Sequence, residues 1–122
     1  MRRGSGTASG ITYVAEQDGA LLGMVVLALE EAPKVRHSAN IYSVYMRPAG
    51  RGSRAIDALI NACTDWAKSQ HVRIVKLAVV TTNAAAIRLY LRCGFTVYGV
   101  EPEMIFWNGT YYDELLMARR LQ

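Results

Sequence analysis

The sequence predicts an α/β (α+β) fold, in which one mixed, mostly antiparallel central sheet is flanked by helices. Two Gly-containing pairs, Asp18-Gly19 and Asn108-Gly109, lie between β-rich runs and are typical of hairpins. Two segments with helical spacing each lie between strands, which favours a sheet with crossover connections. The chain has 122 residues, 52% of them hydrophobic, enough to bury one core and too few for two domains.

The N-terminal part predicts a hairpin after a short leader. Residues 1–10, MRRGSGTASG, are rich in Gly, Ser and Arg without periodicity, so we expect a flexible leader followed by one domain over residues 11–122. Residues 11–31 form two extended runs around Asp18-Gly19, a pair that tolerates the positive φ of a tight turn.

The middle of the chain predicts a strand, a loop and a helix. SANIYSVYM is an apolar and aromatic run that Pro48 ends, because proline lacks a backbone donor. The loop RPAGRGS follows, and Ser53 is the expected N-cap of a helix over residues 54–70. Its apolar residues recur at helical spacing: Ala55, Leu59, Ala62, Cys63, Trp66 and Ala67.

The C-terminal part predicts a strand, a second helix and a final hairpin. VRIVKLAVV is the strand, and NAAAIRLYLRCGF is a helix that Asn83 caps and Gly94 ends. FTVYGV continues as a strand, and Asn108-Gly109 joins EMIFW to TYYDELLMARRL. The expected order is therefore β-β-β-α-β-α-β-β.

Composition narrows the classes of function. No apolar run reaches the roughly 18 residues of a membrane helix, and the start lacks a secretory hydrophobic segment, so we expect a cytoplasmic protein with no membrane partner. Cys63 and Cys93 lie in helices and predict reduced core thiols. His37 and His71 have no ligand-spaced partner, so no metal is expected. The net charge of +4 admits anionic ligands, but it is spread along the chain, so no nucleic acid is expected.

Two segments predict a ligand site. A strand that enters a Gly/Arg loop and then a helix presents free N–H groups and the positive end of a helix dipole, which suits a diphosphate. Arg47, Arg51 and Arg54 add charge there, although such clusters are usually solvated surface. In the second helix, Asn83 and Tyr90 lie on one side because seven residues make nearly two turns. Tyr90 is either part of the site or a packing residue whose hydroxyl reaches a carbonyl.

These two segments together resemble the signatures of the GNAT superfamily of acetyl-CoA-dependent N-acetyltransferases. The first is VYMRPAGRGSRAIDALI, residues 44–60, and the tail YYDELLM is similar to the closing strands of that family. The second signature is matched by Asn83, Ala86, Leu89, Tyr90, Gly94 and Phe95. The resemblance covers the chain from about residue 11 to its C-terminus.

The resemblance implies a role for each matching position. Tyr90 would be the catalytic acid that protonates the departing thiolate, which suits a phenol with a reference pKa of about 10. Asn83 would fix the pantetheine arm, Ala86 would leave room for it, and Arg92 would reach the adenosine phosphate. The backbone would bind acetyl-CoA along the strand at Val44, Tyr45 and Met46, and around the diphosphate at Arg51, Gly52, Ser53, Arg54, Ala55 and Ile56.

The chain departs from the family pattern in three places. Arg54 and Ile56 stand where the pattern has glycine or alanine, which lets backbone approach phosphate closely. Relatives usually have a strand and one or two helices before the first hairpin. Many also have an acid where this chain has Tyr42 and Ser43. Glu30 and Glu31 are alternatives as a base, but a solvated turn explains them equally, so no base is assigned.

The resemblance implies an N-acetyltransferase in which an amine attacks the thioester of acetyl-CoA directly. The alternative is a non-catalytic CoA-binding or assembly domain, derived from a truncated acetyltransferase. A homodimer is also expected, because the first strand, near residues 11–15, would be an open sheet edge.

Overall fold

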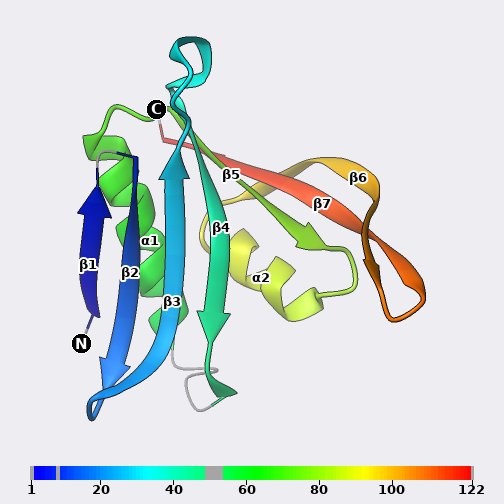
Figure 1. Cartoon of the computed structure of the whole chain (residues 1–122), viewed down its shortest axis with the longest axis horizontal. Helices are drawn as coiled ribbons and strands as arrows, with labels where there is room; N and C mark the ends of the chain where they lie inside the picture. Colours follow the sequence, from blue (N-terminus) through cyan, green and yellow to red (C-terminus); the bar gives the residue numbers. More distant parts are fainter. Residues whose placement is uncertain (1, 8, 49–53, 122) are drawn as a thin grey trace.

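The computed structural model describes residues 2–7, 9–48 and 54–121, which form one seven-stranded sheet with two α-helices (Figure 1). The strand order across the sheet is β1-β2-β3-β4-β5-β7-β6. The elements are β1 Arg2–Thr7, β2 Gly10–Gln17, β3 Ala20–Leu29, the 3₁₀ turn η1 Pro33–Val35, β4 Ser38–Met46, α1 Ala55–Ser69, β5 Ile74–Val80, α2 Ala84–Arg92, β6 Thr96–Trp107 and β7 Thr110–Arg120.

The predicted mixed sheet is confirmed. β4 and β5 pair in parallel, and the other neighbouring strands pair antiparallel. Both predicted hairpin turns have positive φ at their two central residues: 53° and 79° at Asp18-Gly19, and 48° and 80° at Asn108-Gly109. These values match the primed turn whose twist suits adjacent strands. FTVYGV and EMIFW belong to the single strand β6, which has register irregularities at Val97/Gly99 and Glu101/Ile105.

The expectation of a flexible leader is wrong for residues 2–7. They form β1, which pairs antiparallel with β2 from Thr7↔Gly10 to Arg2↔Ala15. A ladder is made by backbone groups, so residues without an apolar pattern can still add a strand to an existing edge. β2 is therefore covered and is not the open edge from which a homodimer was expected. The outer strands of the described sheet are β1 and β6.

Both helices lie on one face of the sheet. Arg119 of β7 shows this, because its guanidinium donates to the side chains of Asn61 and Thr64 in α1 and to the carbonyl of Cys93 after α2. In the view of Figure 1, α1 lies behind β2 and β3, and α2 lies in the opening between β4 and β5. The core between helices and sheet includes the fully buried Val25, Leu27, Leu59, Ile60, Val75, Phe95 and Met117.

The helix ends differ in how well the sequence predicts them. Asn83 caps α2 as expected, and Gly94 follows its end with φ 88°. α1 begins at Ala55, and its N-cap position is Arg54 instead of Ser53, which lies outside the described residues. Cys63 and Cys93 are free and buried, as predicted. Among the described residues, no helix is long and apolar enough to cross a membrane.

Candidate functional site

The central feature of the site is the separation of β4 from β5. Their parallel pairing covers only the register from Ser38↔Ile74 to Asn40↔Lys76. Beyond Asn40, β4 stays paired with β3 as far as Met46↔Gly23, while β5 stays paired with β7 as far as Val80↔Glu114. Over residues 41–46, the edge of β4 that faces β5 therefore has no strand partner within the part of the chain that the structure describes. Its N–H and C=O groups are available to an extended ligand.

A β-bulge lies where the two strands part. Val26 pairs with Ser43 and Leu27 pairs with Ile41, so Tyr42 is an extra residue in β4. A bulge bends its strand and increases the local twist, which turns β4 away from β5. Tyr42 is 68% exposed.

A cleft of about 840 Å³ lies between the unpaired edge of β4, the start of α1 and one side of α2. Most of the predicted site residues line it together: Val44, Tyr45, Met46, Arg54, Ile56, Asn83, Ala86, Tyr90 and Arg92. Ala55 does not line the cleft and instead packs against the core. Arg51, Gly52 and Ser53 lie outside the described residues.

The side-chain amide of Asn83, at the start of α2, has one atom bound to the helix and one atom directed to other partners. Its Oδ1 accepts a hydrogen bond from the Ala86 N–H at 3.1 Å, which satisfies one of the free donors of the first turn. In the described part of the chain no hydrogen bond of its Nδ2 is found, so this amide group is available to a ligand. Ala86 follows on the cleft side, where its small side chain leaves the wall open.

Tyr90 lies on the wall of the cleft with its ring held in the core. The residue is 7% exposed, and its ring packs edge-on against Phe95 with 6.2 Å between centroids and 64° between planes. Within the described residues its hydroxyl makes no hydrogen bond, so the alternative in which it reaches a carbonyl is not observed. Burial, with a smaller contribution from Cys93, raises the pKa of Tyr90 to about 12. The phenol is thus protonated at neutral pH and can donate.

Asp57 is a member of the site that the sequence did not single out. It lies in the first turn of α1, and Arg92 donates to it from Nε to Oδ2 at 3.1 Å and from Nη2 to Oδ1 at 3.3 Å. Arg54 Nη1 is 3.5 Å from the same Oδ2. Burial raises the pKa of Asp57, but the hydrogen bond and charge of Arg92 and the charge of Arg54 outweigh it and hold that pKa below its usual value. Only the spacing of Arg54 and Asp57, three residues apart, could have signalled this group.

The backbone conformation of Arg54 is the one that glycine favours, although the residue departs from the glycine pattern. Its φ is 64° and its ψ is 8°, in the left-handed region that glycine occupies without strain. The backbone at this position keeps the conformation that glycine favours, although the residue is arginine. Ala85, Arg88 and Leu89 complete the cleft wall on α2.

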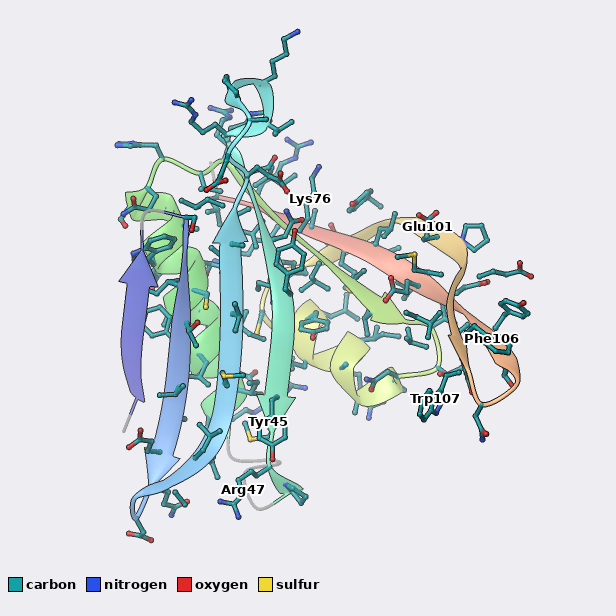
Figure 2. All side chains as sticks on the ribbon, viewed as in Figure 1. Tyr45, Arg47, Lys76, Glu101, Phe106 and Trp107 are labelled. Atoms are coloured by element: carbon teal, nitrogen blue, oxygen red, sulfur yellow. The ribbon has the colours of Figure 1, made fainter. Side chains whose placement is uncertain are left out.

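Two other residues that were weighed as candidates from the sequence lie elsewhere. Arg47, one of the three arginines considered for a phosphate site, does not line the cleft: its Nη1 donates to the Leu21 carbonyl at 3.2 Å and its N–H donates to the Leu22 carbonyl. These bonds continue the β3–β4 ladder, and Figure 2 shows Arg47 beyond Tyr45, pointing away from α2. Glu30 accepts from Asn40 Nδ2 at 2.6 Å, at the end of β4 where the strands are still paired. It is therefore remote from the cleft.

Comparison with known proteins places this geometry in a family. Residues 3–95 match the model of the Acetyltransferase (GNAT) family. The chain is 31% identical over 109 residues to the L-amino acid N-acetyltransferase AaaT of Escherichia coli, covering 87% of this chain and 65% of that protein. The match begins at residue 3, within β1, in agreement with the strand found there.

Solved structures agree with the sequence relatives. The structure of yncA from Salmonella typhimurium, which contains its cofactor acetyl-CoA, superimposes with a TM-score of 0.84 at 25% identity, covering 93% of this chain and 65% of that one. A ribosomal-protein-alanine N-acetyltransferase from Brucella melitensis gives 0.83 at 26% identity, covering 92% and 69%. The chain thus spans roughly two thirds of these relatives and a smaller part of others, such as 38% of an N-acetyltransferase of Methanocaldococcus jannaschii. It belongs to the acetyltransferase (GNAT) family.

Proposed function

We propose that the protein is an N-acetyltransferase that transfers the acetyl group of acetyl-CoA to an amine by direct attack. The observation that best supports this is that one cleft contains both the edge of β4 without a strand partner and the side chain of Tyr90. An extended pantetheine arm can add to the free edge as another strand would, and the phenol on the same cleft wall would give a proton to the leaving thiol.

The cleft residues fit the chemistry of this cosubstrate. Backbone groups of Val44, Tyr45 and Met46 would pair with the amides of pantetheine, and Asn83 Nδ2 would reach the same arm. The start of α1 would receive the diphosphate at Arg54 and Ile56, together with the preceding Arg51, Gly52 and Ser53. Arg92 would reach the adenosine phosphate, and a cleft of about 840 Å³ is within the usual size of ligand sites.

The reaction needs one proton donor and one proton acceptor. The amine nitrogen attacks the thioester carbonyl carbon, the C–S bond breaks, and its electron pair leaves on sulfur. Tyr90 would give its proton to that sulfur, and the N–H groups of β4 would stabilise the negative carbonyl oxygen. The attacking nitrogen releases its own proton to solvent or a base, and no residue is assigned as that base.

A non-catalytic CoA-binding or assembly domain is the second candidate. Two exposed aromatic residues, Tyr42 and Tyr98, favour it, because both line one hollow of the sheet surface between β4, β5 and the β6–β7 hairpin. We further propose that the protein is cytoplasmic and forms a homodimer. Support for the dimer comes from exposed aromatic residues on the β6–β7 hairpin. The edge of β2, from which the dimer was first expected, is covered by β1.

The test is a titration followed by a turnover assay. Calorimetry with acetyl-CoA should give binding at micromolar to millimolar ligand, and absence of both heat and a thermal shift would overturn the proposal. Release of free thiol should then be measured with a panel of amines that begins with L-amino acids, because the Escherichia coli relative is named for them. Binding without thiol release on any amine would favour the non-catalytic candidate.

A further inference from the structure

Asp57 places a negative charge inside a cleft whose other charged lining residues, among those that the structure describes, are arginines. Arg54, Arg88 and Arg92 line the same cleft, and Asp57 holds two of them. The Asp57 side chain is 17% exposed, whereas that of Arg92 is 42% exposed. A poorly hydrated carboxylate therefore lies between two better hydrated guanidinium groups.

This carboxylate has the properties of a bound phosphate oxygen pair. It accepts two roughly parallel hydrogen bonds from one guanidinium, the fork geometry with which arginine also binds phosphate. It lies in the first turn of α1, where the helix dipole favours an anion. Its partners are thus the groups that would bind the phosphates of CoA.

We propose that Asp57 is a resident anion that lowers the affinity of the cleft for phosphate-containing ligands. A phosphate group that binds Arg92 and Arg54 must compete with Asp57 for their N–H donors. It must also approach the carboxylate of Asp57, which has the same sign of charge. This inference depends on the proposed function, because the ligand is the CoA cosubstrate and its CoA product.

The opposite role, in which Asp57 helps binding by holding Arg92 in place, has less support. Fixing one side chain saves only a small ordering cost. Repulsion would act between the carboxylate and any phosphate charge that its partners Arg54 and Arg92 bind, and the Asp57 side chain is only 17% exposed, so water screens it less than a surface charge. The repulsion is therefore expected to exceed the benefit of fixing Arg92.

The test compares two substitutions on the same helix. Asp57→Asn keeps the shape of the side chain and removes its charge, and Asp65→Asn is the matched control because Asp65 is exposed and does not line the cleft. Calorimetric titration with CoA should show Asp57→Asn binding about three- to tenfold tighter than wild type, and Asp65→Asn binding equally. Pantetheine, which has no phosphate, should show no gain in any variant.

Several outcomes would overturn the inference. Equal or weaker CoA binding by Asp57→Asn would do so, as would an equal gain with pantetheine or with Asp65→Asn. Thermal unfolding checks that each variant is folded. If Asp57→Asn is not folded, Asp57→Ser replaces it, because serine is also compatible with the start of a helix. A wild-type protein that fails to bind CoA would refute the proposed function itself, whereas normal wild-type binding without a gain in the variant refutes only the role of Asp57.

Discussion

Arg92, the last residue of α2, donates two hydrogen bonds to Asp57 in the first turn of α1, across 35 positions of sequence. Because one partner belongs to each helix, the pair fixes the end of α2 against the start of α1 at the mouth of the cleft. The same pair therefore affects both the stability of the helix layer and the charge available to a ligand.

The first prediction concerns the pH dependence of this pair. The pKa of Asp57 is held below its reference value of 3.8, so the folded state favours the ionised carboxylate. A depressed pKa contributes stability above the unfolded-state value, and that contribution is lost as pH falls through the folded-state value. Arg92→Gln should lower the urea midpoint at pH 7, and the gap to wild type should close as pH falls below about 4. A gap that is constant down to pH 3 would contradict this account.

The second prediction concerns Tyr90. Tyr90→Phe removes only the hydroxyl, while the ring still packs against Phe95, so CoA affinity should stay near that of wild type. If the hydroxyl protonates the leaving thiolate, kcat should fall by about 10²- to 10⁴-fold. The measurement is steady-state thiol release together with a CoA titration of both proteins. Unchanged turnover would make Tyr90 a packing residue only.

Much of the fold follows from signals within a few residues of one another. The Asn83 cap, the Gly94 stop and the two Gly-containing turns each depend on a local backbone requirement, and each is confirmed. The resemblance of residues 44–60 and 83–95 to one family then indicated which segments meet in the cleft.

The parts that could not be predicted depend on contacts between distant segments. β1 could not be predicted because its sequence has no apolar pattern. Its pairing with β2 is made by backbone groups, which every sequence has. Arg47 follows the β3–β4 ladder away from the cleft, and this direction is set by a neighbouring strand. Asp57 acquires its role only when the end of α2 comes beside it, since nothing in its own segment specifies Arg92 as a partner.

The third prediction concerns Arg54 and its left-handed backbone. A non-glycine residue at φ 64° costs roughly 1 kcal/mol, which glycine would not lose. Arg54→Gly should therefore have a free energy of unfolding about 0.5 kcal/mol higher than that of Arg54→Ala, because the relief of strain exceeds the entropy of the more flexible unfolded chain and both variants lose the contact with Asp57. Arg54→Ala is the matched control, since it removes the same charge and keeps the strain. Equal stability of the two variants in urea unfolding would assign the effect to the side chain and contradict the strain argument.

The last prediction concerns the far part of the β6–β7 hairpin, defined by residues 104–112. The pairing of β5 with β7 ends at Val80↔Glu114, and the Thr81 N–H after it donates to the Asp113 carbonyl, so β7 residues 110–112 have no partner in β5 and the hairpin extends past the rest of the sheet (Figure 2). Phe106 and Tyr111 face each other across the hairpin with 4.7 Å between ring centroids. Both are 61% exposed, and Trp107 is 71% exposed.

Exposed aromatic residues that cluster on one element are typical of protein interaction sites. We therefore expect this hairpin to form the homodimer contact, with a two-fold axis as the commonest arrangement. A contact of about 1,600 Å² in total would persist at micromolar concentration. Phe106→Ser should shift the equilibrium toward a monomer of 13.5 kDa, whereas Tyr42→Ser, which changes a similarly exposed aromatic residue on β4, should not. Light scattering coupled to size exclusion measures both variants across a dilution series. A wild-type protein that is monomeric at every concentration would refute the dimer, and a dimer that Phe106→Ser leaves intact would move the contact away from the hairpin.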